Sequence, residues 1–337
     1  MSSLTSDRLR GGVIGFGNIG QTLTRFLRER RADHAQVVAM FDPSPVARGV
    51  AERDFGLLAS STLDEFFAAK LDFVIIASIS SAHAEHVERA AQAGCHVFCE
   101  KPIALTLVGA DRAIAAAEGA SVVNVVNYSL RYIEAYRTLH AWSRNGRFGQ
   151  LLSVSHRRTR GFGLHIGGAR HPAVLQPGIS GGWAVHHACH ALDLLYWLNG
   201  PFSTVYGRTA TTVANSTSEE IVEGLLTYAN GGIGQVGDSV CGLREHHTQI
   251  IGTLGSAVLS GEHEHTRLRF RGEGAGADET VAVRDTKNAG AAFDHFFECI
   301  RIGARSPQSL REARVSLAAA LALRESAATG KVLALAS

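Results

Sequence analysis

The feature that most constrains the fold is a glycine-rich turn close to the N-terminus. A segment ending in the apolar pair Val13-Ile14 is followed by Gly15-Phe16-Gly17-Asn18-Ile19-Gly20, and then by an apolar pattern of helical period over residues 19–27. In a strand, turn and helix of this kind, Gly15 permits a tight turn, Gly17 lets a pyrophosphate approach the backbone, and Gly20 lets the helix pack on the strand. The sequence therefore predicts a dinucleotide-binding unit.

An acidic residue follows the next strand-like segment. Residues 35–41 (AQVVAMF) are mostly apolar, and Asp42 comes directly after them, twenty-two residues beyond Gly20. An acid near this offset hydrogen-bonds the adenosine ribose and would repel the 2′-phosphate of NADP. Because no arginine follows Asp42 directly, we expect the cofactor to be NAD rather than NADP. The alternative is that Asp42 is a turn residue before Pro43.

The rest of the first half alternates between strand and helix patterns. The predicted strands are residues 57–60, 73–77, 96–99 and 122–126, and the predicted helices are residues 45–53, 63–69, 83–93 and 106–117. Such alternation predicts an α/β Rossmann fold, a doubly wound parallel sheet that binds its ligand at the carboxyl ends of the strands. We expect residues 1–127 to form this NAD-binding domain.

The second half changes to strand-length segments separated by turn signals. The predicted strands are residues 151–158, 203–213, 221–229, 232–240 and 247–253, and the predicted helices are residues 183–198, 291–301 and 309–328. This pattern favours an α+β domain over residues 128–337, with a large open antiparallel sheet and with its last helices returning towards the Rossmann domain. The glycine-rich segment 161–182 is a candidate loop over the binding site.

A rare lysine follows the strand at residues 96–99. The chain has four lysines and twenty-nine arginines, and one of the four is Lys101 in Glu100-Lys101-Pro102. An arginine stays protonated in proteins, whereas burial or a nearby cation can make a lysine exchange its proton near neutral pH. Lys101 is therefore a candidate for proton transfer. The alternative is a lysine that merely closes a loop.

A long segment of the second half has no acidic residue. Residues 135–192 contain no Asp or Glu but seven arginines and seven histidines. Such a stretch would attract an anionic substrate, although some of its arginines could instead face the cofactor phosphates or solvent. At its end, His186, His190 and the following Asp193 are spaced to share one face of a helix, where the two imidazoles could contact substrate, relay a proton or bind a metal. We expect no metal, because such a histidine pair lacks a third ligand, and we expect His187 to point off this face.

The composition excludes several other classes of protein. The chain is 45% hydrophobic and 19% charged with a formal net charge of +2, and it has no apolar run long enough to span a bilayer. No secretory signal or nucleic-acid-binding module is recognisable. The five cysteines are odd in number and lack metal-type spacing, which favours reduced thiols. We therefore expect a cytoplasmic protein that acts on a small molecule rather than on nucleic acid or a membrane.

Together these motifs resemble one known family. The glycine turn, ASISSAHAEHVERAAQAGCHVFCEKP, NYSLRY, the two glycines before the histidine helix, IIGTLGSAVLS and SAATGKVLAL are similar to segments of the Gfo/Idh/MocA family (glucose-fructose oxidoreductase, inositol dehydrogenase and relatives). The resemblance runs from about residue 10 to the end of the chain. It implies a Rossmann domain followed by an open-faced antiparallel sheet, hydride transfer to or from sugars and cyclitols with NAD(P), and association into a homodimer or homotetramer through that sheet.

The resemblance also implies which residues form the site. Lys101 and His190 match the catalytic lysine and histidine, and His186 stands where the family commonly has an aspartate, so His186 is a candidate neutral relay. The expected cofactor-binding residues are Gly15, Phe16, Gly17, Asn18, Ile19, Gly20, Asp42, Ser78, His83, Glu100 and Lys101. The expected substrate-binding residues are Asn127, Arg131, Arg158, Arg160, His165, Trp183, His186 and His190.

Three functions are compatible with these residues. The leading hypothesis is an NAD-dependent oxidoreductase that transfers a hydride between NAD(H) and a secondary alcohol or ketone of a sugar or cyclitol, either neutral or anionic. The alternative is an NAD-dependent glycosidase that oxidises the sugar transiently at carbon 3, eliminates the aglycone, adds water and reduces again. A nucleotide-sensing protein without catalysis is disfavoured, because both Lys101 and His190 are present.

Overall fold

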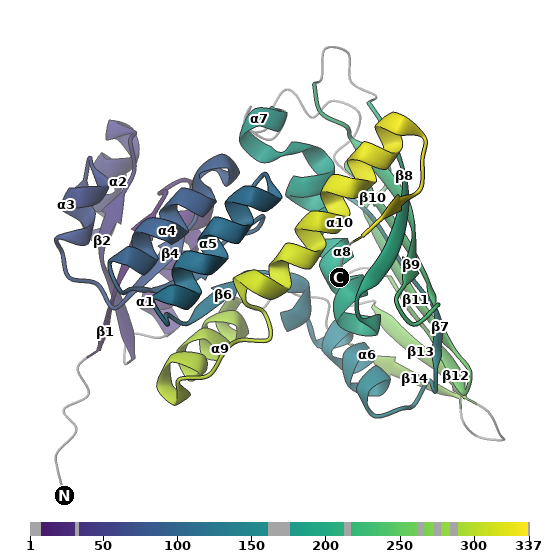
Figure 1. The fold of residues 1–337 in the computed structure, drawn as a ribbon. Coiled ribbons are helices and arrows are strands. Elements are labelled where there is room, and N and C mark those ends of the chain that lie inside the picture. Colours follow the sequence, from purple (N-terminus) through teal and green to yellow (C-terminus); the bar gives the residue numbers. More distant parts are fainter. Residues whose placement is uncertain are drawn as a thin grey trace, which may run out of the picture. The chain divides into compact units, whose positions relative to one another are not determined.

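The chain folds into two compact units, each with its own sheet. The computed structural model describes residues 8–30, 34–160, 176–211, 217–261, 266–272, 278–283 and 289–335. The first unit comprises Met1–Asn127 with Ala289–Ala313, and the second comprises Tyr128–Asn288 with Arg314–Ser337 (Figure 1). No helix among the described residues is long and apolar enough to cross a membrane.

The first unit is built on a six-stranded parallel sheet, which confirms the predicted doubly wound fold. The strands lie in the order β3-β2-β1-β4-β5-β6. Their bounds are β1 Leu9–Ile14, β2 Ala35–Phe41, β3 Leu58–Ser60, β4 Phe73–Ile76, β5 His96–Cys99 and β6 Asn124–Val126. The chain runs outward from β1 to β3, returns to β4 beside β1, and runs outward again to β6. Strands β1 and β4 therefore flank the point where the strand order reverses.

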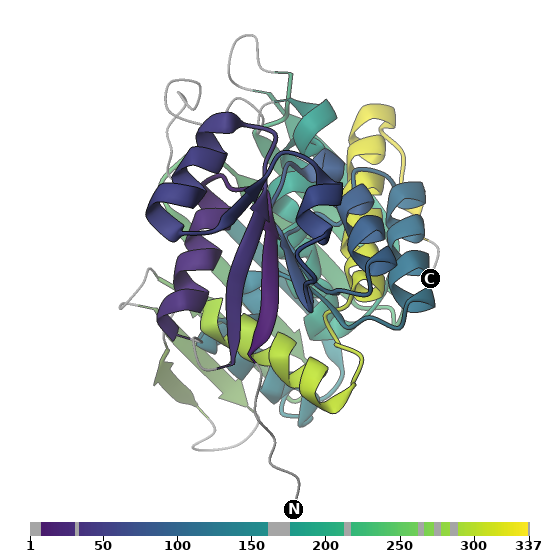
Figure 2. The same ribbon diagram turned by 90° about the vertical axis from the view of Figure 1, so that its left-hand side faces the viewer.

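Helices cover both faces of this sheet. They are α1 Asn18–Arg30, α2 Pro45–Phe55, α3 Leu63–Phe67, η1 Ser80–Ala82, α4 His83–Gln92, α5 Leu107–Gly119 and α9 Ala289–Ile302. Helices α1 and α9 lie together on one face, and α4 and α5 lie together on the other (Figure 2). Side-chain caps fix where several of these helices begin. For example, the Thr106 hydroxyl accepts a hydrogen bond from the Gly109 amide at 3.1 Å and caps the N-terminus of α5.

Helix α9 completes the core of the first unit from far along the chain. Phe293 and Phe296 are fully buried, and the Phe293 ring stacks on that of Phe98 with 4.4 Å between ring centroids. Phe296 meets Phe73 of β4 at 6.0 Å. These contacts support β4 and β5, the two strands that lead to Ser78 and to Glu100-Lys101.

The second unit is built on a nine-stranded sheet in the order β14-β13-β12-β11-β7-β10-β9-β8-β15. The bounds are β7 Leu151–Thr159, β8 Phe202–Ala210, β9 Ile221–Tyr228, β10 Ile233–Ser239, β11 Glu245–Gly252, β12 Gly255–Ser260, β13 Arg267–Gly272, β14 Glu279–Ala282 and β15 Leu333–Ala334. The predicted large antiparallel sheet is confirmed, with one difference. Strands β7 and β10 pair in parallel, which the intervening helices and the hairpin of β8 and β9 make possible.

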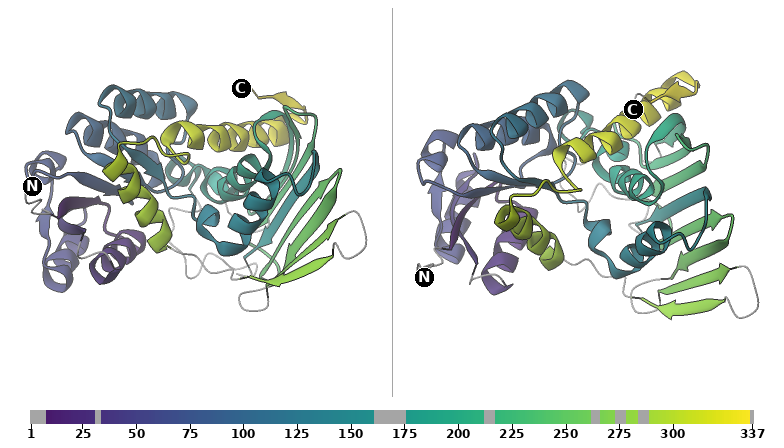
Figure 3. Two further views of the ribbon diagram at one scale, coloured as in Figure 1. Left: turned by 90° about the horizontal axis from the view of Figure 1, so that it is seen from below. Right: turned by 60° about the horizontal axis from the view of Figure 1, so that its bottom comes forward.

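Helices lie on one face of this sheet. They are η2 Ser129–Tyr132, α6 Glu134–Arg144, α7 Pro177–Ser180, the π-helix η5 Ala184–Ala188, α8 Cys189–Asn199 and α10 Leu310–Thr329, whose first turn belongs to the first unit. The opposite face carries none of the described helices (Figure 3). Along β7 the side chains alternate accordingly, since Val154 and His156 are fully buried under the helices whereas Arg157 is exposed.

Two sequence predictions in this region need correction. The helix expected over residues 183–198 is not uniform, because its first part is the π-helix η5 and the α-helix begins at Cys189. The candidate loop 161–182 contains the short helix α7, while residues 161–175 lie outside the described residues.

The role of α9 predicts unequal losses of stability from two phenylalanines. Phe293→Ala should lower the free energy of unfolding by about 3–5 kcal/mol, because it leaves a cavity under a fully buried ring. Phe297→Ala changes the same side chain one turn later, where it is partly exposed, and should lower the free energy of unfolding less. Chemical denaturation of both variants measures the difference. Equal losses would show that α9 does not form this core.

Candidate functional site

Polar and glycine residues follow five of the strands in the first unit. Gly15 follows β1, Asp42 follows β2, Ser78 lies two residues after β4, Glu100 follows β5 and Asn127 follows β6. Parallel strands place their carboxyl ends at one edge of the sheet, so these residues line that edge. The sequence-predicted cofactor residues of the first unit thus come together, along with Asn127.

The three glycines of the turn are needed for different reasons. Gly15 has φ +89°, and a Cβ there would lie 2.5 Å from the Ser78 nitrogen. A Cβ at Gly20 would lie 2.1 Å from the Gly15 carbonyl oxygen. By contrast, a Cβ at Gly17 would meet no described atom within 4 Å. The packing of the chain itself therefore requires Gly15 and Gly20, while Gly17 keeps clear the space through which a pyrophosphate would pass.

Asp42 connects the glycine turn to the end of β2. Its carboxylate accepts hydrogen bonds from the Phe16 amide at 2.8 Å and from the Ser44 amide at 2.9 Å. Each carboxylate oxygen keeps a second acceptor position, so the side chain can still accept from a ribose hydroxyl. Asp42 is therefore a turn residue, and its contact with the ribose stays a prediction.

His83 is enclosed by the backbone of two neighbouring loops. The ring is buried, with Nδ1 2.6 Å from the Pro102 carbonyl oxygen and Nε2 3.0 Å from the Ser78 carbonyl oxygen. Burial lowers the pKa of His83, and the two carbonyls and Glu100 oppose that effect. Both ring nitrogens face backbone oxygens, so the ring supports the segments that carry Ser78 and Lys101, and its predicted contact with cofactor stays a prediction.

Glu100 and Asn127 interact beside Lys101. The Asn127 amide donates a hydrogen bond from Nδ2 to Glu100 Oε1 at 2.7 Å. Asn127 is buried, and its Oδ1 has no hydrogen-bond partner within the described ranges. A buried acceptor without a partner is costly unless a ligand supplies a donor. This acceptor and the open approach at Gly17 fit a bound dinucleotide, whose pyrophosphate would face the turn and whose polar end would face Asn127.

The second unit contains a buried cluster of aromatic and histidine rings. Trp183 and His187 stack with centroids 4.3 Å apart, and the His187 ring meets the edge of His190 at 5.9 Å. Tyr128 packs against His190 at 5.9 Å. Asp238 of β10 accepts hydrogen bonds from Trp183 Nε1 at 2.8 Å and from His187 Nδ1 at 2.8 Å.

This cluster changes the prediction for the histidine helix. His186 and His190 were expected to lie one above the other, which assumes α-helical geometry. The π-helix η5 has a wider turn through residues 184–188, and His187, which was expected to point off the site face, makes the ring contact with His190. No periodic pattern of residues in the sequence reveals a π-turn. The assignments of His186 and His190 to catalysis remain predictions.

Two predicted substrate residues form hydrogen bonds to buried carboxylates in the interior of the second unit. Arg131 of η2 donates from Nε and Nη2 to Asp193 of α8 at 2.8 and 2.7 Å, and both side chains are buried. Trp183 is buried against Asp238, as described above. A paired buried arginine and carboxylate hold η2 on α8, so the contact of Arg131 with substrate stays a prediction.

The remaining predicted substrate residues lie on and after β7. Arg158 stands opposite Asp238 in the pairing of β7 with β10, and the Arg160 amide donates to the Ser239 carbonyl at 2.9 Å. His165 lies outside the described residues. Arg158 and Arg160 are partly buried. Arg158 lowers the pKa of Asp238, and both arginines lower the pKa of His187, so their positive charge acts on this pair.

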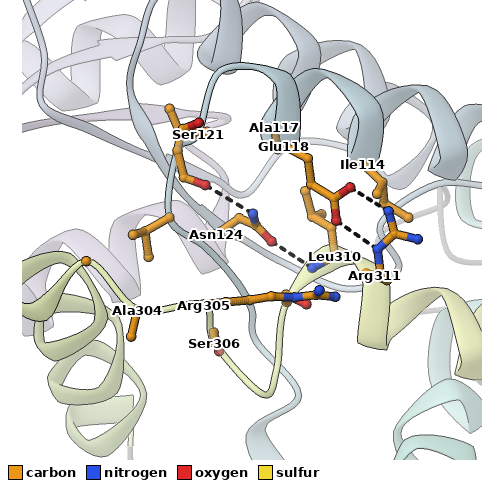
Figure 4. Close-up of a pocket in the computed structure, with 14 residues that line it drawn as sticks. Ile114, Ala117, Glu118, Ser121, Asn124, Ala304, Arg305, Ser306, Leu310 and Arg311 are labelled. Carbon is orange, nitrogen blue, oxygen red and sulfur yellow. Dashed lines mark hydrogen bonds and ion pairs between the residues drawn. The ribbon is translucent and has the colours of Figure 1, made fainter.

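A separate cavity of about 490 Å³ in the first unit lies at the opposite edge of the sheet, near the start of β6 (Figure 4). Its polar groups bind one another. Asn124 Oδ1 accepts from the Leu310 amide at 2.8 Å, and Arg311 Nε donates to Glu118 at 2.8 Å. These bonds attach the first turn of α10 to α5 and β6, so the cavity belongs to the packing of the unit rather than to the carboxyl edge.

Comparison with known proteins identifies the class. Residues 9–128 match the model of an oxidoreductase family with an NAD-binding Rossmann fold, and residues 136–258 match the GFO/IDH/MocA C-terminal domain. These matches cover more than half of the chain, which belongs to the Gfo/Idh/MocA family of NAD-binding oxidoreductases. The resemblance found from the motifs is confirmed.

Several proteins are similar over most of the chain. A 1,5-anhydro-D-fructose reductase of Ensifer adhaerens is 28% identical over 333 residues, 96% of this chain and 97% of that protein. A 2,7-anhydro-N-acetylneuraminate hydratase of Escherichia coli is 27% identical over 269 residues, 78% of this chain and 70% of that protein. The structure of a levoglucosan dehydrogenase in complex with NADH has the same fold, with a TM-score of 0.86 at 22% identity over 97% of this chain and 99% of that one.

Buried histidines predict a loss of stability in acid. His156 is fully buried beside Thr248, and burial lowers its pKa from 6.5 to about 3. Below pH 6.5 the unfolded chain binds a proton that the folded protein excludes, so stability should fall as the pH drops from about 6.5 towards 3. His156→Gln should reduce that slope by on the order of 1 kcal/mol per pH unit.

Urea unfolding of the His156 variant at several pH values measures this slope. Ser155→Ala, on the outward face of the same strand, is the matched control and should keep the wild-type slope. A His156→Gln variant with an unchanged slope would contradict a neutral buried imidazole at this position.

Proposed function

We propose that the protein is an NAD-dependent oxidoreductase that transfers a hydride between NAD(H) and a secondary alcohol or ketone of a sugar or cyclitol. The observation that carries the proposal is the position of Glu100-Lys101 directly after β5, at the same edge of the sheet as the glycine turn. The names of similar proteins support it, since they include a reductase and a dehydrogenase of anhydro sugars. Bound NAD would supply the hydride acceptor at this edge.

Lys101 is assigned the proton of the reacting hydroxyl. Alcohol oxidation needs a group that takes the hydroxyl proton, and ketone reduction needs one that returns it. A lysine side chain can do both, whereas an arginine keeps its proton. His190 and His186 of the second unit are assigned to the same exchange, with His190 hydrogen-bonding the hydroxyl and His186 relaying its proton. Asn127, beside Glu100, is assigned to binding a donor group of the ligands.

The substrate and assembly assignments rest on the second unit. Arg158 and Arg160 are assigned to an anionic group on the sugar, because they place positive charge beside the buried histidine cluster. The helix-free face of the nine-stranded sheet is assigned to association into a homodimer or homotetramer, since it presents unburied strands such as β7 and β9.

Replacing the lysine tests the leading assignment. Lys101→Met should retain NADH binding, because the glycine turn and Asp42 are unchanged, and should lower kcat by about 10²-fold or more through loss of the acid–base group. Fluorescence titration measures NADH binding, and NADH absorbance measures turnover on a panel of sugars and polyols. Lys70→Met, in the turn before β4 where the Lys70 carbonyl accepts a hydrogen bond from Arg10 of β1, is the control and should behave as wild type. Full turnover by Lys101→Met would remove Lys101 from the mechanism.

The choice of NAD over NADP is assigned to Asp42. A carboxylate beside the ribose would repel a 2′-phosphate, and such a juxtaposition costs several kcal/mol. Asp42→Asn should therefore improve NADP relative to NAD by about tenfold or more, as measured by the two dissociation constants. Asp54→Asn, on the exposed side of α2, should leave the ratio unchanged. A wild-type protein that already prefers NADP would refute the assignment.

The second candidate function is a redox-neutral reaction, in which the sugar is oxidised transiently at carbon 3, loses or gains a group and is reduced again. Two observations favour it: a relative over most of the chain is named a hydratase, and His186 stands where the family commonly has an aspartate. Net accumulation of NADH with a free sugar would support the dehydrogenase. Cleavage of a glycoside, or hydration of an anhydro sugar, without net NADH would support the second candidate.

A further inference from the structure

Asp238 is a buried carboxylate that the proposed function does not use. It lies on β10 and is 1% exposed, yet its side chain is hydrogen-bonded to two groups of the histidine cluster. A buried ionised carboxylate is costly unless nearby donors and charges stabilise it. Its donors are the Trp183 indole and the His187 imidazole, so the carboxylate is held in place by rings of the candidate site.

The contact with Asp238 selects one form of His187. Nδ1 lies 2.8 and 3.0 Å from the two carboxylate oxygens, so Nδ1 carries the hydrogen and donates it. In a neutral ring with Nδ1–H, Nε2 holds a lone pair and accepts hydrogen bonds. The carboxylate is completely buried, whereas about a tenth of the His187 side-chain surface is exposed. The exposed part of the pair is therefore the imidazole.

The surrounding charges favour an ionised Asp238 and a neutral His187. Burial raises the pKa of Asp238, but His187, Arg158 and the Trp183 N–H have the larger opposite effect. The pKa of Asp238 is therefore below its usual value. Burial, together with Arg160 and Arg158, lowers the pKa of His187 to about 4 against the opposing effect of Asp238. The rings of Trp183 and His190 both contact that of His187.

We propose that Asp238 and His187 form the carboxylate–imidazole pair of the substrate site. His187 Nε2 accepts a hydrogen bond from a substrate hydroxyl next to the reacting one, whose proton stays assigned to Lys101, and Asp238 is the positioning residue. This inference deepens the proposed function and rests on it. It also gives the Trp183 contact a role, since the indole N–H fixes the carboxylate that orients the imidazole.

This contact leaves the proton balance of the proposed reaction unchanged. The proton of the reacting hydroxyl goes to Lys101 as the carbon loses the hydride, and no covalent bond forms or breaks at His187 Nε2. Asp238 remains ionised and keeps the hydrogen of the imidazole on Nδ1.

Nitrogen NMR of the histidine rings tests the pair without turnover. In the wild-type protein we expect His187 to be neutral near pH 7, with its hydrogen on Nδ1. Asp238→Asn should move part or all of that hydrogen to Nε2. A wild-type ring with its hydrogen on Nε2 would overturn the proposal. So would a His187 ring whose signals do not move when sugars and polyols are added to the NADH-loaded protein.

Kinetics test the assigned roles. Asp238→Asn should lower kcat by about 10²–10⁴-fold with a small change in KM, because it disturbs the tautomer but not a substrate contact. His187→Gln should lower kcat by about 10²-fold and raise KM as well. In both variants the pH profile of kcat/KM should lose the fall in activity that accompanies protonation of His187. A purely structural role would lower Tm and leave kcat and the pH profile unchanged.

A matched control variant and a separate readout distinguish failure of the Asp238–His187 pair from failure of the proposed function. Glu223→Gln removes a partly exposed carboxylate that pairs with Arg157 on β7, and it should keep wild-type kinetics and ring signals. Wild-type protein without turnover on any sugar or glycoside would refute the proposed function, while the ring tautomer and its response to sugars would still decide the pair. If Asp238→Asn fails to fold, His187→Gln and the wild-type tautomer decide it.

Discussion

The candidate cofactor site depends on the parallel pairing of β1 with β2 and β4. This pairing brings the ends of strands that are far apart in the sequence to one edge, and short hydrogen bonds then fix the loops there. Asp42 binds the amide of Phe16, and Asn127 binds Glu100. Without the strand order, none of these loops would face another. The chemistry assigned to Lys101 therefore rests on β5, which the aromatic core beneath it holds in place.

The second unit depends on a different constraint, the pairing of buried charge. Arg131 and Asp193 neutralise each other between η2 and α8, and Asp238 is stabilised by donors from the histidine cluster. The first pair holds η2 on α8, and the bonds to Asp238 hold η5 on β10, because loss of either partner leaves an uncompensated buried charge. Side chains that look like substrate ligands in the sequence are therefore also structural, and His187 gains a defined tautomer from the same arrangement.

The sequence predicted the first unit well, because its signals are local. The glycine turn, the alternation of strand and helix patterns and the Thr106 cap each depend on residues near one another. The strands at both edges of the second sheet were not predicted, although Arg267, Leu268, Arg269 and Phe270 alternate in the period of a strand. Such short segments next to charged residues are weak signals until neighbouring strands pair with them. Helix α9 was predicted as a helix, but not as a part of the core of the first unit.

The sequence by itself determined the family, the turn that fits a pyrophosphate and the exceptional position of Lys101, since each follows from residue types at fixed spacing. Tertiary structure decided which buried groups meet. Asp238 lies fifty-one positions from His187, and no periodic pattern connects a residue on β10 with one in a π-helix. The π-turn also brings the His187 ring against that of His190. Hydrogen bonds between distant segments form only after strands and helices have packed, so the partners of the histidine cluster could be found only in the folded chain.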